Sequence, residues 1–537
     1  MATPTALSPD NASPWSPFRH RAFAVLWTAT VISNVGTWMQ SAGAGWLMTS
    51  LDPQPLTVAL VQLATALPMF LLALPAGALA DIVDRRRLLL GVQIVATAIT
   101  AVLALLVARN LVTPGSLLLF TGALGVTSAL IAPAWQSIVP LLVPRSDLPP
   151  AVALGSVGVN VSRAVGPALA GVIIGALDIA APFWINAASN LIVIAALLWW
   201  RSAAPGANPL PPERFTPAMV IGLRHARFNP LLRATLVRAA FFFPLASAYW
   251  ALLPLVARQQ VAGGPALYGL LLGTIGCGAV AGALALPRIK ARFGADWVAG
   301  GGMIGTALAL GLFGAAREPV AAFVASAVAG LAWIAVLATI NVSAQIALPA
   351  WVRGRGLAIY VTVMFGGLTI GSYCWGQIAA WIGISAALIA AAVILLATLP
   401  IAWRWKLASG AGIDLTPSAH WPAPVLAGDV AADRGPVLVT VEYRIRPEDR
   451  AAFLTAMDTL RRQRRRDGAY DWRIYEDAAH AGCFVETFYL SSWLEHLRQH
   501  QRVTEADRVA EAAVARLHIG DAPPRVTHLI AAQPDGL

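Results

Sequence analysis

Twelve apolar runs, each long enough to cross about 30 Å of hydrocarbon as a helix, fill most of the first 406 residues of this 537-residue chain. With 58% hydrophobic and 12% charged residues, the chain is too apolar for a water-soluble protein, in which about 25% of residues are charged. The runs lie at about 23–48, 57–80, 88–108, 114–140, 151–175 and 181–200, then, after a polar stretch at 201–230, at 231–257, 266–286, 297–316, 320–345, 357–380 and 383–403. The sequence therefore predicts an all-α membrane protein with twelve transmembrane helices.

The charges predict how these helices are oriented. Residues 1–406 carry 23 Lys and Arg against 9 Asp and Glu, whereas residues 407–537 carry 15 against 18. If the N-terminus is cytosolic, 17 basic residues fall on the inner side and 3 on the outer side, as the positive-inside rule requires. The first 18 residues lack the basic start and apolar core of a signal peptide. We therefore expect a disordered cytosolic tail at 1–18, a cytosolic linker at 201–230 and a cytosolic C-terminus.

The two halves of the apolar region, 19–200 and 231–406, repeat each other. GALADIVDRRR from Gly77 recurs as GALALPRIKARFG from Gly282, 205 residues later. Transporters that work by alternating access place a substrate between two such pseudo-symmetric bundles. We therefore expect two six-helix pseudo-repeats.

Three motifs resemble the major facilitator superfamily. The loop after the second run resembles its loop 2–3 signature at Gly77, Leu79, Ala80, Asp81, Arg85 and Arg86, and departs from it at Ile82 and Asp84. The fifth run resembles its antiporter motif at Ser162, Gly166, Pro167 and Gly171. The stretches SNVGTWMQSAGAGWLM from Ser33, LPAGALADIVDRRRLL from Leu74 and NVSRAVGPALAG from Asn160 resemble the subfamily of the bacterial enterobactin exporter, of the transmembrane secretion effector type. The resemblance covers nearly all of 19–406 and implies a transporter of the bacterial inner membrane.

Elementary electrostatics gives these motifs a mechanical role. An Asp and several Arg at a helix junction can bind each other or helix-end dipoles in one conformation and release them in another. We assign this gating role to Gly77, Leu79, Asp81, Arg85 and Arg86, with topology signalling by the arginines as the alternative. In the fifth run, proline breaks the helix and glycine lets a neighbouring helix approach closely, which would provide either a hinge or ordinary tight packing. The residues concerned are Gly166, Pro167 and Gly171.

Arg163, near the middle of the fifth run, is an isolated cation in a region where no run carries a central Asp or Glu. A mid-bilayer arginine costs about 2.5 to 3.5 kcal/mol on the insertion scale, so it should face a cavity or a partner. We predict an anion site there, with binding to backbone carbonyls as the alternative. The other polar residues predicted to line the transport path are Asn160, Asn34, Gln40, Gln136, Asn341, Gln345 and Tyr360. Each of these could instead make an interhelical hydrogen bond.

A linker rich in Gly, Pro and Ala at 407–435 precedes a soluble domain at 436–532. Alternation predicts strands from Val437, Tyr470, Cys483 and Arg525, and apolar periodicity predicts helices after Pro447, after Ser492 and over 506–517. The order β-α-β-β-α-β predicts a small α+β, ferredoxin-like fold. The stretch SSWLEHLRQHQRVT from Ser491 resembles domains of the antibiotic-biosynthesis monooxygenase type. That resemblance implies dimerisation and, in some members, cofactor-free oxygenase or haem-degrading chemistry.

The ionisable residues of this domain predict no active centre. His496 and His500 have the spacing of half a metal site, but a solvated helix face is the simpler interpretation. Five arginines end the first helix: Arg461, Arg462, Arg464, Arg465 and Arg466. Three interpretations are open: they interact with the dipole of that helix, they dock the domain on an anionic leaflet, or they contact nucleic acid. Three cysteines without a CxxC spacing indicate neither a disulfide framework nor a zinc site. We therefore expect no metal, no cofactor and no catalytic residues.

Taken together, these features predict an exporter of a small anionic metabolite, siderophore or drug. Its expected partners are that substrate, the lipid bilayer and a second copy of the chain through the C-terminal domain, but not nucleic acid. Two alternatives remain open. One is a membrane-tethered, monooxygenase-like enzyme coupled to export, and the other is an importer.

Overall fold

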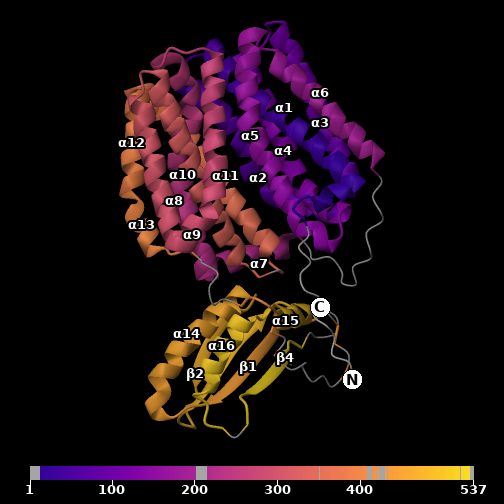
Figure 1. Ribbon diagram of the computed structural model, residues 1–537. Helices are drawn as coiled ribbons and strands as arrows, with labels where there is room; N and C mark the ends of the chain where they lie inside the picture. The colour runs from indigo at the N-terminus through magenta and orange to yellow at the C-terminus, as the bar shows by residue number, and fades with distance from the viewer. Residues whose placement is uncertain are drawn as a thin grey trace. The chain divides into compact units, whose positions relative to one another are not determined.

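The computed structural model describes residues 13–200, 215–349, 351–407, 414–418, 420–421, 428, 430–431, 433–520 and 522–532. They belong to two compact units (Figure 1). The helical unit comprises 1–209, 237–341 and 360–406, and the mixed unit comprises 210–236, 342–359 and 407–537. Most of the tail predicted at 1–18 lies outside the described residues, as do 201–214 and much of the predicted linker at 407–435.

The first half of the helical unit contains six long helices at the positions of the first six apolar runs. Proline in the first turn starts α2, α4, α5 and α6, because that turn does not use its N–H groups for internal bonds. Thr113 and Ser116 form a capping box that begins α4. The helices are α1 Arg21–Leu51, α2 Pro55–Ile82, α3 Arg85–Ala108, α4 Pro114–Leu142, α5 Leu148–Ala176 and α6 Ala181–Trp199, with short turns η1 Ser16–Arg19 and η2 Arg145–Asp147.

The second half of the membrane region contains α8 Pro230–Leu255, the π-helical turn η3 Val256–Gln260, α9 Pro265–Ala315, α10 Pro319–Ile346, α11 Arg353–Ile382, α12 Ile384–Ala397 and α13 Leu399–Arg404. Within the described residues, eleven helical segments are long and apolar enough to cross a membrane. One of them, α9, contains 51 residues and covers two of the predicted runs. It bends at Gly294, whose φ of 79° interrupts the helical backbone; glycine adopts this conformation without steric cost.

Glycines let the two halves approach closely inside the helical unit. A Cβ at Gly171 of α5 would lie 2.7 Å from the carbonyl oxygen of Pro265, and one at Gly276 of α9 would lie 2.4 Å from the Cα of Ala164. Because these neighbours are backbone atoms, no side-chain rotation would make room for a larger residue. The α5–α9 contact is therefore a backbone-to-backbone seam.

Polar contacts also join the halves at the end that carries Asp52, here called the Asp52 end. The Arg258 guanidinium of η3 donates to the hydroxyls of Thr49 (2.9 Å) and Ser50 (2.7 Å) of α1. The same guanidinium lies 5.6 Å from the ring centroid of Trp46, against which Tyr268 of α9 stacks. The opposite end of these helices, which carries Asp84, is called the Asp84 end. At the Asp52 end, therefore, the halves are held together by hydrogen bonds and stacked rings.

The mixed unit is built on a four-stranded antiparallel sheet of order β2-β3-β1-β4. Its elements are α7 Phe215–Phe228, β1 Val437–Arg444, η4 Pro447–Asp449, α14 Arg450–Arg466, β2 Tyr470–Glu476, β3 Cys483–Leu490, α15 Trp493–Arg502, α16 Glu505–Ala515 and β4 Arg525–Ile530. The predicted strand starts and the β-α-β-β-α-β order are confirmed, with two helices before the last strand. The stretch predicted as a linker at 201–230 differs, because it contains α7.

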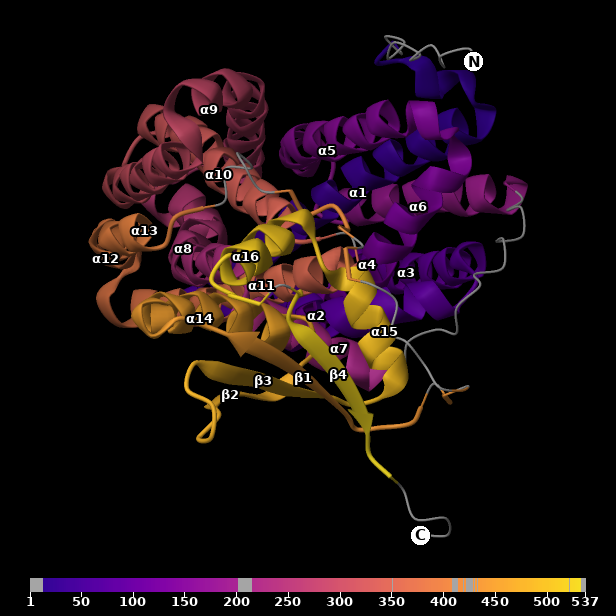
Figure 2. The same ribbon diagram turned by 90° about the horizontal axis from the view of Figure 1, so that it is seen from below.

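The sheet buries one face against helices. Figures 1 and 2 show α14 and α16 against the same side of the sheet. Phe453 and Met457 of α14 pack there with Val441, Tyr443 and Phe484 of the strands. On the other face the strands carry partly exposed apolar side chains, among them Leu438, Val485, Tyr489 and Leu529. The sheet thus has one covered face and one open face.

Candidate transport site and gating loop

Two arginines of the predicted gating loop donate to backbone carbonyls of neighbouring helices. The Arg86 guanidinium donates to the carbonyl oxygens of Leu197 (2.7 Å) and Leu198 (3.0 Å), in the last turn of α6. The Arg85 guanidinium donates to Ser137 O of α4 at 3.3 Å. Helix C-terminal carbonyls carry partial negative charge, so these contacts are favourable. Arg86 thus contacts a helix end and Arg85 contacts a carbonyl inside α4, and their role in gating stays a prediction.

The other members of the loop are placed less tightly. Asp84, which departs from the family signature, caps α3 by accepting from the Arg87 backbone N–H at 2.8 Å. A Cβ on Gly77 would meet nothing within 4 Å, and Leu79 is exposed. Asp81 lies in the last turn of α2, and its side chain is outside the described part of the chain. The gating role of Asp81 therefore stays a prediction.

In α5, Gly166, Pro167 and Gly171 serve packing. A Cβ on Gly166 would lie 2.6 Å from the Trp38 Cβ and 2.8 Å from the carbonyl oxygen of Val35, both in α1. Gly166 thus fits α5 to α1, while Gly171 fits it to α9. Pro167 lies inside the helix and is buried. These contacts support the packing role, and a hinge role stays a prediction.

Arg163 of α5 lies against an aromatic ring. Its guanidinium carbon is 5.1 Å from the ring centroid of Trp38, within the range of a cation–π contact. The residue is partly exposed, but its Nε atom is fully enclosed and has no hydrogen-bond partner among the described residues. Tyr249 of α8 acts on it electrostatically. By contrast, Arg238 of α8, which is buried, pairs with Asp296 at 2.5 Å.

Tyr249 belongs to a cluster of aromatic side chains from α8 and α10. Its ring centroid lies 5.2 Å from that of Trp250 and 6.4 Å from that of Trp333, and the two indoles are 5.6 Å apart. Neither indole N–H has a hydrogen-bond partner within the described ranges. Tyr249 Oη and Trp250 Nε1 interact electrostatically without completing a hydrogen bond of standard geometry. We call Arg163, Tyr249, Trp250 and Trp333 the donor cluster.

Among the predicted path residues, several already have hydrogen-bond partners. Gln40 of α1 is buried and accepts from Asn186 of α6. The Asn160 amide donates to Ser156 O of its own helix at 2.8 Å. These bonds match the structural alternative for Gln40 and Asn160.

The remaining path residues are spread over several helices and both units. Asn34 is partly buried on α1, and Gln136 is exposed on α4. Tyr360 is buried and bonds to Asn341. Gln345 is exposed and belongs to the mixed unit. Their role in transport stays a prediction.

Sequence reasoning missed two asparagines one helical turn apart on α6. Asn190 accepts from the Ser33 hydroxyl at 2.7 Å and from the Gln93 amide at 2.9 Å, linking α1, α3 and α6. Its neighbour one turn earlier, Asn186, bonds to Gln40. Their spacing of four inside an apolar run was the available signal.

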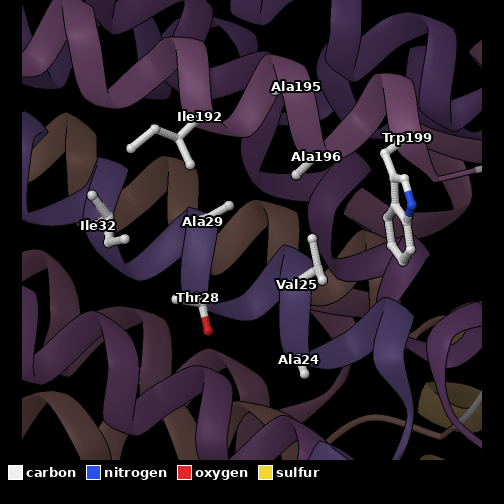
Figure 3. A pocket seen from close by; sticks show the side chains of 9 residues that line it. All are labelled: Ala24, Val25, Thr28, Ala29, Ile32, Ile192, Ala195, Ala196 and Trp199. Atoms are coloured by element: carbon white, nitrogen blue, oxygen red, sulfur yellow. The ribbon is translucent and has the colours of Figure 1, made fainter.

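A groove of about 590 Å³ lies between α1 and α6 (Figure 3). The residues that line it are Ala24, Val25, Thr28, Ala29, Ile32, Ile192, Ala195, Ala196 and Trp199. None of these side chains is charged, and only Thr28 and Trp199 carry a polar atom. An apolar chain would fit such a surface, but an anionic substrate would find no counter-charge there.

In the mixed unit, two arginines that were expected at a solvated helix end are internal. Arg464 Nε lies 3.3 Å from Glu486, which is fully buried, and Arg464 NH1 lies 2.7 Å from Glu511. Arg466 bridges two buried carboxylates, at 2.7 Å and 2.8 Å. Although burial alone would raise it, the pKa of Glu511 lies below its ordinary value because of the nearby Arg464 charge. These ion pairs contradict the leaflet interpretation for Arg464 and Arg466, whereas their place in the last turn of α14 agrees with the dipole interpretation.

Helix α7 packs against the ferredoxin-like part of this unit. The Arg224 guanidinium donates to Gly468 O at 3.1 Å, and the His225 ring lies edge-on to Trp351, with centroids 5.6 Å apart. Burial lowers the pKa of His225 to about 3. The charged groups that act on it are Arg466 and Arg502, which lower this pKa further, and Asp507, which raises it. His225 is therefore neutral at pH 7.

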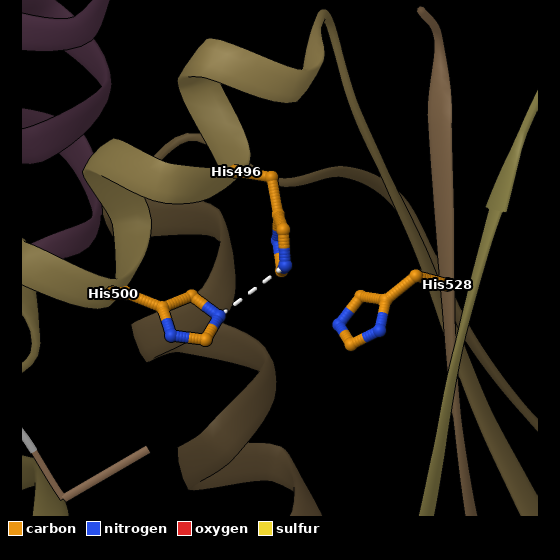
Figure 4. Close-up of side chains that lie close together, drawn as sticks. All are labelled: His496, His500 and His528. Carbon is orange, nitrogen blue, oxygen red and sulfur yellow. Dashed lines mark hydrogen bonds between the residues drawn. The ribbon is translucent and has the colours of Figure 1, made fainter. Parts of the chain in front are cut away.

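Three histidines gather in the same unit, His496 and His500 from α15 and His528 from β4 (Figure 4). Burial lowers the pKa of His496 to about 3 and that of His500 to about 4. Both rings are thus neutral at pH 7. Sequence spacing identified two of these residues, whereas His528 joins them only through the fold.

Comparison with known proteins agrees with this architecture. The profile of a family described as transmembrane secretion effector matches residues 12–535. The staphyloferrin A transporter of Staphylococcus aureus is 25% identical over 261 residues, which are 48% of this chain and 65% of the relative. An uncharacterised MFS-type transporter of Bacillus subtilis is 27% identical over 223 residues, which are 41% of this chain and 52% of the relative. The chain thus matches less than two thirds of the length of either relative.

Solved transporters share the fold. A bacterial homologue of the human lysosomal transporter Spinster superposes with a TM-score of 0.56 at 14% identity, covering 72% of this chain and 97% of that one. A POT family transporter in complex with 5-aminolevulinic acid gives a TM-score of 0.59 at 14% identity, with coverage of 72% and 97%. Since the family profile covers nearly the whole sequence, this chain belongs to the transmembrane secretion effector family of major facilitator transporters.

Proposed function

We propose that this protein exports a small anionic molecule, a metabolite, siderophore or drug, across a bacterial inner membrane by alternating access. Both termini and the Asp84 end face the cytosol in this proposal. The α9 helix, which bends at Gly294, crosses the membrane twice, so the chain has twelve spans. At about 1.5 Å per residue its 51 residues would extend roughly 75 Å, more than twice the thickness of the hydrocarbon.

The observation that carries the anionic cargo is the donor cluster. Arg163 Nε, Tyr249 Oη and the indole nitrogens of Trp250 and Trp333 can all donate hydrogen bonds, and all are buried. Trp250 Nε1 interacts with Tyr249 Oη, but none of the four atoms completes a hydrogen bond of standard geometry within the described residues. A buried donor without a partner costs about 1 to 3 kcal/mol. A ligand rich in carboxylate or phenolate oxygens would supply the missing acceptors, and the aromatic faces would hold its apolar part.

The contacts between the two halves support an inward-facing state. Hydrogen bonds from Arg258 and Gln259 to α1 and the following loop lie at the Asp52 end. In the proposed orientation that end is the outer one, so these contacts close the outer side of the helical unit. Export then requires the Arg258 contacts to break and Arg85 and Arg86 to exchange their partners.

The name of one relative is compatible with this cargo class. The matching protein of Staphylococcus aureus is described as a staphyloferrin A transporter, which places a siderophore among the candidates. Outward transport is supported by the family description, transmembrane secretion effector. An importer of the same anion is the rival that the transport assay must exclude.

A direct binding measurement tests the anion site. Candidate anions come from comparing metabolites inside and outside cells with and without the protein. Each is titrated into the purified full-length protein while tryptophan fluorescence is recorded, because Trp250 and Trp333 lie in the cluster. Arg163→Gln should weaken anion binding about tenfold or more, since it removes a charge-assisted hydrogen bond of about 1.5 to 3 kcal/mol.

The matched control is Arg109→Gln, which removes an exposed arginine at the end of α3. It should leave the affinity unchanged. Equal affinities for wild type, Arg163→Gln and Arg109→Gln would return Arg163 to a packing role beside Trp38.

The open face of the sheet supports the proposed second copy of the chain as a partner. Leu438, Tyr489 and Leu529 lie side by side across β3, β1 and β4, and Tyr470 stacks on Tyr489 with ring centroids 5.8 Å apart. A sheet with one uncovered apolar face is stabilised when another layer packs on it. A dimer through this face would bury these side chains.

A further inference from the structure

The ferredoxin-like part of the chain holds three histidines that the transport function does not use. His496 and His500 lie one turn apart on α15, and His528 projects from β4. Figure 4 shows the three imidazoles turned toward a common point. One ligand nitrogen from each ring lies within 4.8 Å of the other two.

The strand register explains why His528 joins the pair. His528 lies directly opposite Val439 of β1, and residues opposite each other in an antiparallel pair share a face of the sheet. Val439 is buried beneath Trp493, the first residue of α15. His528 therefore points to the face that α15 covers.

We propose that His496, His500 and His528 bind a divalent transition-metal ion of the Zn²⁺ type, with a fourth coordination position open. Imidazole nitrogens are good ligands for this ion, and three protein ligands with an exchangeable fourth are a common arrangement. The open position would take water or an anionic oxygen donor. A metal-binding site on the domain is independent of the proposed cargo.

The distances suit the ion. Zn–N bonds of about 2.0 to 2.1 Å in a tetrahedron place ligand nitrogens roughly 3.3 Å apart. His496 Nε2 and His500 Nε2 are already 3.2 Å apart. The third nitrogen, within 4.8 Å, must move by roughly 1.5 Å to complete this geometry. His500 and His528 are only partly buried, so their rings have room to adjust.

Hydrogen bonding leaves the cluster incompletely satisfied. His496 is 2% exposed, and its Nδ1 has no hydrogen-bond partner among the described residues. Its Nε2 contacts only another imidazole in the described structure. A metal bound at Nε2 would leave the ring proton on Nδ1, so the orphaned Nδ1 is not itself explained by the ion. The Nε2 pair instead indicates the ion, because two imidazole lone pairs this close repel each other unless an ion lies between them. Coordination to a metal would use imidazole lone pairs that the protein leaves unpaired.

Aromatic side chains hold the rings in place. Trp493, which is 3% exposed, packs on His496 with centroids 5.1 Å apart and on His528 at 6.1 Å. Trp421 lies edge-on to His500 at 5.0 Å. Such contacts restrict ring rotation and shield the site from water, which favours a defined metal geometry. The aromatic contacts thus keep the three imidazoles together before any ion binds, and the farthest ring completes the geometry by moving toward the ion.

Metal stoichiometry on the tag-free full-length protein tests the proposal. After treatment with a chelator, the protein is dialysed against Zn²⁺ and then against metal-free buffer, and bound zinc is measured by mass spectrometry. We expect about one zinc per chain in wild type and a loss of at least tenfold in His500→Gln and His528→Gln. His480→Gln is the matched control, because His480 is an exposed histidine of the same domain, and it should retain the full equivalent.

A second measurement needs no variant. Diethylpyrocarbonate modifies free imidazoles, and mass spectrometry can follow the rate at His500, His528 and His480. Zn²⁺ should slow modification of the first two at least tenfold and leave His480 unchanged. Less than a tenth of an equivalent of bound zinc, zinc retained in both variants, or equal slowing at all three histidines would each overturn the assignment.

Discussion

We expect Gly269→Ala to open the Asp52 end of the helical unit. A Cβ at Gly269 of α9 would lie 2.4 Å from the carbonyl oxygen of Pro167 and 2.7 Å from the Cα of Gly171, both in α5. These are backbone atoms, so α5 and α9 must separate by roughly 1 Å to restore ordinary van der Waals distances. Overpacking of this kind costs about 1 to 3 kcal/mol.

That cost falls on the state in which the seam is closed. An energy of 1 to 3 kcal/mol changes a two-state equilibrium by a factor of about 5 to 150. If a few per cent of wild-type molecules are open at the Asp52 end, a substantial fraction of Gly269→Ala molecules should therefore be open there. The control is Gly175→Ala in α5, because a Cβ at Gly175 meets nothing within 4 Å.

The populations can be read from distances between spin labels. Labels at the exposed residues Leu177 and Glu318 report on the Asp52 end, in protein whose cysteines Cys277, Cys374 and Cys483 have been replaced. Gly269→Ala should increase the long-distance population, and Gly175→Ala should leave it unchanged. If folded Gly269→Ala gives the wild-type distances, the seam does not control this end and the reasoning fails.

Three further predictions concern single contacts. Acidification from pH 7.5 to 5.5 should destabilise the docking of α7 by about 1.4 kcal/mol. The folded-state pKa of His225, about 3, lies below its unfolded value, so stability is lost as the pH falls through the unfolded value. Hydrogen exchange in α7 should therefore accelerate in wild type but much less in His225→Gln. Arg86→Ala should lower the melting temperature, since two bonds to helix-end carbonyls are lost, whereas Arg87→Ala, at an exposed position, should not. Tyr489→Asp should convert a dimer of the full-length protein into a monomer in sedimentation without loss of helical signal, and a wild-type monomer at tens of micromolar would contradict the proposed interface.

Local patterns were sufficient for most elements of this fold. Apolar runs predicted the membrane helices because length and hydropathy alone decide whether a segment can cross a bilayer. The strand starts at Val437, Tyr470, Cys483 and Arg525 were predicted within the sheet as observed, because alternating side chains define both strand and buried face. Helix α7 was missed, since a short segment with two arginines and a histidine in its last turns carries no span-length apolar signal.

The candidate sites depended on contacts that sequence spacing cannot show. Arg163 was identified because a charge inside an apolar run is conspicuous, whereas Trp250 and Trp333 look like ordinary apolar residues. Only the packing of α8 against α10 reveals that their N–H groups lack acceptors. His528 is similarly far from His500 in sequence, and the antiparallel register of β4 brings it to α15. Tertiary geometry, not local chemistry, decides these cases.

The central claim is that Arg163 binds an anion whose exit is driven by the membrane potential. The potential contributes about 2.3 kcal/mol per charge per 100 mV, and a tenfold concentration gradient corresponds to about 1.4 kcal/mol. At about 100 mV, each uncompensated negative charge on the anion therefore sustains roughly a fifty-fold outward concentration gradient.

The decisive measurement is efflux of the bound anion from vesicles reconstituted with the protein, at zero pH gradient and with the potential set by valinomycin. We predict that efflux rises with an inside-negative potential and falls at least tenfold in Arg163→Gln but not in Arg109→Gln. Efflux that ignores the potential and follows only a pH gradient, or that is unchanged in Arg163→Gln, would contradict the account.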